Sequence, residues 1–225
     1  MPAFEHAVSL GYRYVETDVH VTSDGELLAF HDDRLDRVTD GTGIIAELPW
    51  SQVRDAKVDG REAIPRFEEL LGAWPALRVN VDPKHDAAVE PLAEALLRTG
   101  AVDRVCVGAF SDKRIARLQT LVGAGLCTSM GPRQVARLVA ASKRLPGGAN
   151  LTAPCAQVPT NQGPLPLVTE RFVATAHRRG VQVHVWTIDD RAEMARLLDL
   201  GVDGIMTDRP AVLKDLLLER GQWHE

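Results

Sequence analysis

Residues 14–33 read YVETDVHVTSDGELLAFHDD, a stretch with six acidic residues and two histidines. Its first half alternates apolar and polar side chains, as a half-buried β-strand does, because successive side chains point to opposite faces. The two faces would carry Val15, Val19 and Val21 on one side and Glu16, Asp18 and His20 on the other. Two carboxylates on one strand face repel each other and lose hydration, so a packed fold rarely keeps them without a cation. The stretch therefore predicts a strand that carries a cation site.

A second strand is predicted directly after the first. Ser23-Asp24-Gly25 has the composition of a tight turn, and the apolar run 27–30 follows it. This run ends at His31-Asp32-Asp33. A charged cluster that closes an apolar strand indicates a functional site at the end of the strand.

Length and composition limit the class of protein. The 225 residues suffice for one large domain, which we predict over 1–225, and the 45% hydrophobic and 25% charged content is typical of a soluble globular protein. A net charge of -5 without a basic run argues against nucleic acid as a partner. No apolar run is long enough for stable membrane insertion, and no basic-then-apolar leader is present. Three scattered cysteines without CxxC spacing suit free thiols in a reducing cytosol, so we predict a cytoplasmic protein.

Strands and helices alternate along the rest of the chain, which predicts an α/β fold with parallel strands and helices outside. The seven main strands are predicted over 14–21, 78–82, 105–110, 125–130, 149–152, 182–188 and 204–207. A helix over 4–10 has no strand before it. The count favours a (β/α)₈ TIM barrel that lacks its first strand. An open doubly wound sheet is the weaker alternative, because no glycine-rich nucleotide loop follows any strand.

In a barrel, the C-terminal ends of the strands meet at one face. Glu16, Asp18 and Asp82 would converge there as three hard oxygen ligands, which suit Mg²⁺ or Ca²⁺ better than zinc. His31 could transfer protons, and Lys84 could face an anionic substrate oxygen. Several other residues are open to more than one interpretation. Trp186 could line the mouth of the site or pack, Arg37 could bind phosphate or be a surface charge, His20 is more plausibly structural, and Gln157 and Asn161 could contact substrate from a long loop.

The chain resembles the glycerophosphodiester phosphodiesterase family over almost its whole length. The matching pieces occur in order: ETDV at 16–19, TSDG at 22–25, HD at 31–32, LDR at 35–37 with Thr39, GTG at 41–43, IP at 64–65, DPK at 82–84, VWT at 185–187 and GVDGIMTDRP at 201–210. No single piece is decisive, but the ordered set is highly specific.

The resemblance implies a (β/α)₈ barrel with a divalent cation that hydrolyses glycerophosphodiesters to an alcohol and sn-glycerol 3-phosphate. It implies Glu16, Asp18 and Asp82 as metal ligands, and His31 as one of two general acid-base histidines. Lys84 and Trp186 are then substrate contacts. The expected partner is a small-molecule glycerophosphodiester.

Two departures from the family pattern modify these expectations. The third carboxylate is more commonly Glu in the family, and Asp82 is one methylene shorter. The family's first strand, with its His-Arg-Gly motif, and the following Glu-Asn-Thr loop do not occur here. We therefore expect the chain as written to hydrolyse its substrate poorly. Two alternatives stay open: a non-catalytic barrel that binds a phosphodiester or cation, and a phosphodiesterase that acts on lysophospholipids.

Overall fold

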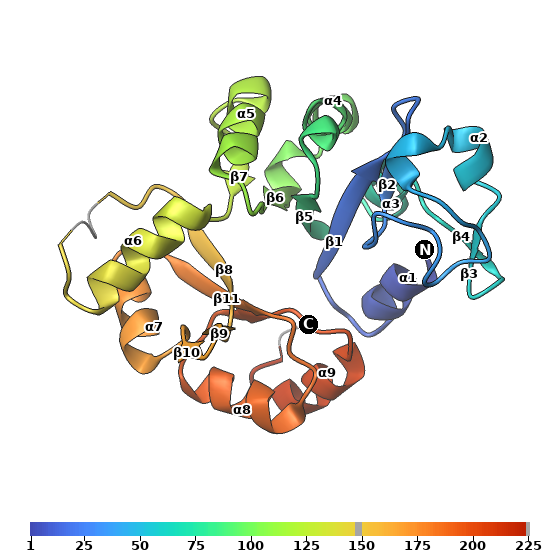
Figure 1. The fold of residues 1–225 in the computed structure, drawn as a ribbon. Helices are drawn as coiled ribbons and strands as arrows, with labels where there is room; N and C mark the ends of the chain where they lie inside the picture. Colours follow the sequence, from blue (N-terminus) through green and yellow to red (C-terminus); the bar gives the residue numbers. More distant parts are fainter. Residues whose placement is uncertain (147–149, 224–225) are drawn as a thin grey trace. The chain divides into compact units, whose positions relative to one another are not determined.

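A computed structural model describes residues 1–146 and 150–223. Parallel strands alternate with helices along the chain, as the sequence predicts (Figure 1). The chain divides into two compact units, residues 1–127 and 128–225, and each is described by itself. The single domain over 1–225 stays a prediction.

The first unit is built on a sheet with the strand order β2-β1-β5-β6-β7. Strand β1 pairs antiparallel with β2 and parallel with β5, and β5 pairs parallel with β6. The strands are β1 (Tyr14–Val21), β2 (Leu27–Ala29), β5 (Arg78–Pro83), β6 (Val105–Val107) and β7 (Cys127–Thr128), the last at the boundary of the unit. The helices are α1 (Pro2–Ser9), α2 (Trp50–Val53), α3 (Phe67–Ala73), α4 (Val89–Thr99) and α5 (Asp112–Val122), and β3 (Lys57–Val58) and β4 (Glu62–Ala63) form a separate hairpin.

The predicted turn between β1 and β2 is present, and a hydrogen bond from the start of α2 stabilises it. Gly25 has a φ of 97°, a left-handed conformation that favours glycine. The Thr22 hydroxyl donates to Asp24 at 2.6 Å, and the same carboxylate accepts the backbone N–H of Trp50 at 2.8 Å. The start of α2 is thereby joined to the hairpin that carries the acidic residues.

Two hydrophobic clusters hold this unit together. The larger one packs Val19, Val79 and Val81 of the sheet against α3 and α4, including the fully buried Phe67. The smaller one joins Leu28 of β2 to residues between β2 and α3: Leu35, Ile45, Val53, Ala56 and Ile64. The apolar face of β1 therefore anchors the strand, so its polar face is left to carry Glu16, Asp18 and His20.

The second unit contains a three-stranded parallel sheet with the order β12-β11-β8. Its strands are β8 (Cys155–Pro159), β11 (Gln182–Trp186) and β12 (Gly204–Ile205), and β9 (Asn161–Gln162) and β10 (Leu165–Pro166) form a hairpin. Its helices are α6 (Pro132–Ser142), α7 (Glu170–His177), α8 (Arg191–Asp199) and α9 (Pro210–Glu219).

One predicted strand is wrong. Residues 150–152 are not a strand, and Asn150 has a left-handed φ of 64° that a strand does not allow; Ala149 lies outside the described residues. The strand is β8, which begins at Cys155 and pairs with β11 from Gln182. Pro154 directly precedes this strand and Pro159 ends it, and prolines at such positions are typical of a loop in the sequence. Gln157 and Asn161 consequently lie on β8 and β9 rather than in a long loop.

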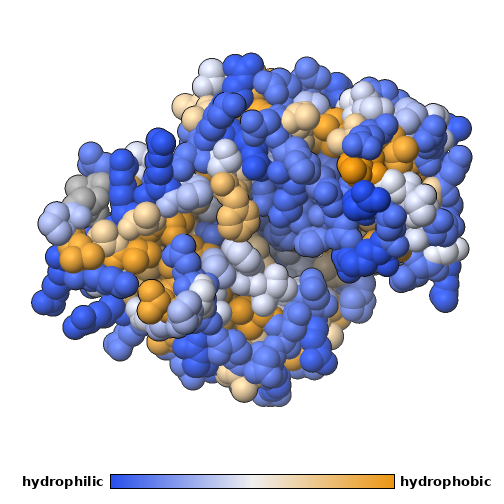
Figure 2. All heavy atoms as spheres, in the orientation of Figure 1, coloured by the Kyte–Doolittle hydropathy of each residue, from blue (hydrophilic) through white to orange (hydrophobic). Residues whose placement is uncertain are grey.

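On the face drawn in Figure 2, hydrophilic residues cover most of the surface and hydrophobic residues form smaller patches between them. Within residues 1–146 and 150–223, no helix is long and apolar enough to cross a membrane. The cytoplasmic location stays a prediction.

Candidate active site

Asp18 and Asp82 lie side by side on neighbouring parallel strands. They are register partners in the β1–β5 ladder, as are Glu16 and Asn80 two positions earlier. Because side chains alternate along each strand, Glu16 and Asp18 share one face with Asp82. Asp18 is almost fully buried, with 6% of its side chain exposed. The structure thus brings Asp18 and Asp82 together, and the three-carboxylate ligand set with Glu16 stays a prediction.

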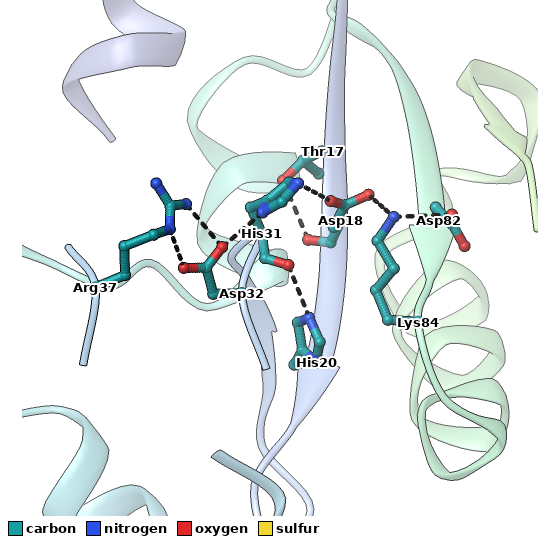
Figure 3. A network of polar contacts seen from close by, with 8 residues as sticks. All are labelled: Thr17, Asp18, His20, His31, Asp32, Arg37, Asp82 and Lys84. Carbon is teal, nitrogen blue, oxygen red and sulfur yellow. Dashed lines mark hydrogen bonds and ion pairs between the residues drawn. The ribbon is translucent and has the colours of Figure 1, made fainter. Parts of the chain in front are cut away.

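Lys84 joins the two aspartates (Figure 3). Its Nζ lies 2.8 Å from Asp18 Oδ1 and 3.0 Å from Asp82 Oδ2, and its backbone N–H donates to the carbonyl of Val19. Burial alone would lower the pKa of Lys84, but the hydrogen bonds and charges of both aspartates outweigh it and raise that pKa. A positive charge is thus held between the two carboxylates at the end of β5.

The carboxylates fit a hard divalent cation in their chemistry. Asp82 Oδ1 is buried and has no hydrogen-bond partner among the described residues, and burial raises the pKa of this aspartate. Loss of hydration beside the surrounding protein raises the pKa of Glu16 to about 8, and the negative charge of Asp18 adds to the shift. Glu16 and Asp18 therefore repel each other on this face of β1. A cation would relieve this repulsion.

The ligand geometry is nevertheless incomplete as the side chains lie. Among the residues that the structure describes, no group of three or more Asp, Glu, His or Cys side chains is arranged to hold a metal ion. The ammonium group of Lys84 contacts both aspartates instead. Coordination by Glu16, Asp18 and Asp82 therefore requires Lys84 to withdraw.

His31 reaches this cluster through the hairpin. The Phe30 N–H donates to the Asp18 carbonyl at 3.0 Å, which brings the next residue beside Asp18. His31 Nε2 lies 3.7 Å from Asp18 Oδ2, and Nδ1 lies 2.6 Å from Asp32 Oδ1. The imidazole is otherwise open, with 79% of the side chain exposed. The predicted proton-transfer residue therefore stands next to the predicted metal ligands.

The sequence did not predict the contacts behind His31. Arg37, which was open to interpretation as a phosphate ligand or a surface charge, is paired with Asp32 through two hydrogen bonds of 2.6 and 2.7 Å. His20 is buried, as expected of a structural residue, and its Nε2 lies 3.1 Å from the His31 carbonyl. Burial lowers the pKa of His20. The HD and LDR pieces contain Asp32 and Arg37, but nothing in them indicates that the two side chains meet.

An open pocket of about 480 Å³ lies over these residues. It is lined by His20, His31, Asp32, Asp33, Arg34, Asp36, Arg37, Lys84 and His85. The presence of both His31 and Lys84 in its wall means that a ligand there would meet a proton-transfer group and a cation. A small polar molecule suits such a pocket, whose lining sets Asp32, Asp33 and Asp36 beside Arg34, Arg37 and Lys84.

Trp186, the other predicted substrate contact, belongs to the second unit. It is the last residue of β11, and it is partly buried. Its C-terminal position on a parallel strand agrees with the place from which barrel enzymes present site residues.

Comparison with known proteins identifies the family. The model of the glycerophosphoryl diester phosphodiesterase family matches residues 1–212. The chain belongs to this family. It is 39% identical over 230 residues to a protein of Mycobacterium tuberculosis named "Probable glycerophosphodiester phosphodiesterase 2", with 99% of this chain and 86% of that protein covered.

Solved structures agree on the fold. A glycerophosphodiester phosphodiesterase from Agrobacterium tumefaciens superposes with a TM-score of 0.73 at 22% identity, over 94% of this chain and 90% of that one. An Oleispira antarctica phosphodiesterase, solved with the product sn-glycerol-3-phosphate, gives 0.75 at 18% identity, over 96% and 90%. The fold class is therefore the TIM barrel of this family, and the chain is a phosphoric diester hydrolase.

Proposed function

We propose that this enzyme hydrolyses glycerophosphodiesters to an alcohol and sn-glycerol 3-phosphate with a divalent cation held by Glu16, Asp18 and Asp82. The observation that carries the proposal is the pairing of Asp18 and Asp82 around a single positive charge, with His31 Nε2 3.7 Å from Asp18. Mg²⁺ and Ca²⁺ are the cations that suit three carboxylates. Bound there, the cation would neutralise charge on the phosphoryl oxygens.

The residues of the chain supply the rest of the chemistry. Water adds to phosphorus, the bond from phosphorus to the alcohol oxygen breaks, one proton leaves the water and one joins the alcohol. His31 would move one of these protons, because its Nε2 faces the carboxylate cluster. Lys84 would turn from the aspartates toward a phosphoryl oxygen once a metal ion occupies them, and its charge would stabilise the transition state. Trp186 is proposed to contact the substrate.

Lysophospholipids are the second candidate substrate class. The chain is 24% identical over 96% of its length to a human protein named lysophospholipase D. The choice between a short alcohol such as choline and a lysolipid is therefore part of the test. We propose the glycerophosphodiester as the principal substrate, because the residues that line the pocket are all charged residues or histidines and offer no apolar side chain to an acyl chain.

The test is hydrolysis of glycerophosphocholine and lysophosphatidylcholine by the purified chain, followed by ³¹P NMR. Formation of glycerol phosphate and choline identifies the bond that breaks. Chelator should remove activity, and added Mg²⁺ or Ca²⁺ should restore it. Asp18→Asn and Asp82→Asn should lose activity, whereas Asp55→Asn, which changes an exposed carboxylate outside the pocket lining, should keep it.

Each other outcome rejects part of the proposal. Full activity after chelation would exclude the metal requirement. Cation binding by calorimetry, without turnover of either substrate, would favour the non-catalytic barrel. Turnover of the lysolipid alone would assign the lysophospholipid alternative.

A further inference from the structure

The imidazole of His31 has few contacts for a group that has to transfer a proton. Its side chain is 79% exposed, and an exposed imidazole with two free torsions adopts several orientations in water. The backbone at this residue is fixed, since His20 contacts the carbonyl of His31 and the Phe30 N–H bonds to Asp18. These backbone contacts supply no constraint on the imidazole ring itself.

Asp32 is placed to provide that constraint. Its Oδ1 lies 2.6 Å from His31 Nδ1, and only 15% of its side chain is exposed. The hydrogen bonds from Arg37 hold the pKa of Asp32 down at about 2. An ionised carboxylate can only accept hydrogen bonds, so Nδ1 of His31 is the donor. The other nitrogen, Nε2, is thereby left available on the side of Asp18.

Arg37 fixes Asp32 in turn. Its Nε donates to Oδ2 at 2.6 Å and its Nη2 donates to Oδ1 at 2.7 Å, so the planar guanidinium binds the carboxylate in a bidentate geometry. Figure 3 shows the three side chains in a row, from Arg37 through Asp32 to His31, with Asp18 beyond the ring. Oδ1 therefore accepts from both Arg37 and His31.

We propose that Asp32 and Arg37 are positioning residues for phosphodiester hydrolysis: they hold the His31 ring in the orientation and tautomer that present Nε2 to the substrate. The inference rests on the proposed function, because it has a catalytic consequence only if His31 transfers a proton. A purely structural role, closing the loop 32–37, is the competing explanation. It predicts lower stability without a specific effect on the chemical step.

Steady-state kinetics on glycerophosphocholine separate the two explanations. Asp32→Asn keeps the size of the side chain but can donate to Nδ1, which favours the wrong tautomer. We expect kcat to fall about 10- to 100-fold with KM changed less than about threefold, as for a displaced general acid or base. Arg37→Met should lower kcat less than Asp32→Asn does, and kcat of Arg37→Lys should lie between those of Arg37→Met and the wild type. Asp55→Asn and Arg54→Met are the matched controls, from an exposed pair outside the pocket, and should leave kcat unchanged.

A second measurement does not depend on turnover. ¹⁵N NMR of the imidazole should show His31 with its proton on Nδ1 in the wild-type chain. Asp32→Asn should shift the ring toward the Nε2–H form that neutral histidine prefers in water. A structural role would leave the tautomer unchanged, so this signal identifies the positioning effect even where a variant is less stable.

The outcomes distinguish this inference from the function on which it rests. His31→Gln should abolish turnover, and full activity of that variant would reject the proposed role of His31. If His31→Gln is inactive while Asp32→Asn keeps wild-type kcat and tautomer, only the positioning role is rejected. A loss of kcat with an unchanged tautomer and a matching loss of folded protein would also reject it.

Discussion

Asp18 and Asp82 are direct register partners on two parallel strands, and one ammonium group lies within 3.0 Å of both carboxylates. Such a pair is unfavourable without a cation, because both charges are largely removed from water and repel each other. Lys84 supplies the positive charge in the arrangement described here. The local stability of the site and its capacity for a metal ion thus depend on the same two side chains.

The first prediction concerns this ammonium group. Lys84→Met should lower the metal-free free energy of unfolding by about 2 to 3 kcal/mol, because it leaves Asp18 and Asp82 without a counter-charge. Urea denaturation in chelator measures the loss. Lys113→Met is the control, since its pair with Asp86 is exposed on both sides and should contribute less than about 1 kcal/mol. Added Mg²⁺ should stabilise the Lys84 variant more than the wild type. Equal losses in the two variants would contradict the prediction.

The second prediction concerns pH. The folded-state pKa of Asp32 is about 2, below its ordinary value of 3.8, so its ionisation stabilises the folded chain above pH 3.8. That contribution declines as the pH falls from 3.8 through 2. Wild type should therefore exceed Asp32→Asn by about 1 kcal/mol at pH 7, a value reduced for the exposure of Arg37, and by much less near pH 2.5. Urea titrations at both pH values test this. A difference that is the same at both would show that the carboxylate charge does not carry the stabilisation.

The third prediction tests the support beneath the site. Phe67 is fully buried in the cluster that also contains Val19 and Val81, the neighbours of Asp18 and Asp82 in sequence. Phe67→Ala should cost about 3 to 5 kcal/mol, because it leaves a cavity between α3 and the sheet. The measurement is the thermal or denaturant midpoint. Phe110→Ala removes a ring that is 67% exposed, and it should change stability by less than about 1 kcal/mol.

The fourth prediction concerns Trp186. If this ring contacts the substrate, Trp186→Ala should raise KM about tenfold, equivalent to ~1.4 kcal/mol of lost contact. Trp186→Phe keeps an aromatic face and should stay within about threefold of wild type. Both variants are compared at equal folded fraction, judged by circular dichroism. An unchanged KM in the alanine variant would limit Trp186 to packing.

The predictability of this chain differs between its strands and its loops. The bounds of β1 and the convergence of Asp18 with Asp82 follow from side-chain alternation, which is a local property of the sequence. The strand at Cys155 does not follow from the local pattern, because its position depends on pairing with β11, a partner distant in sequence. Pro154 and Pro159, before the strand and at its end, give the stronger local signal there.

The candidate site shows the same division. His31 was found from its place at the end of an apolar run, but its contact with Asp18 depends on the hairpin register. The pair of Arg37 with Asp32 could not be predicted, because side-chain pairing within an irregular loop has no periodic signature. The tripartite ligand set of Glu16, Asp18 and Asp82 stays a prediction, as does weak turnover by the chain as written.

The β1–β5 ladder also limits how this gene can change in length. Side chains in a strand alternate with a period of two, so inserting or deleting one residue between Tyr14 and Asp18 would exchange the two faces. Asp18 would turn toward the apolar cluster, and Val19 after a deletion, or Thr17 after an insertion, would take its place opposite Asp82. A change of one codon in length would therefore disrupt both the hydrophobic packing of β1 and the carboxylate site. Length variants should instead be tolerated at exposed turns such as the one at Gly60, in a hairpin that contains none of the proposed site residues.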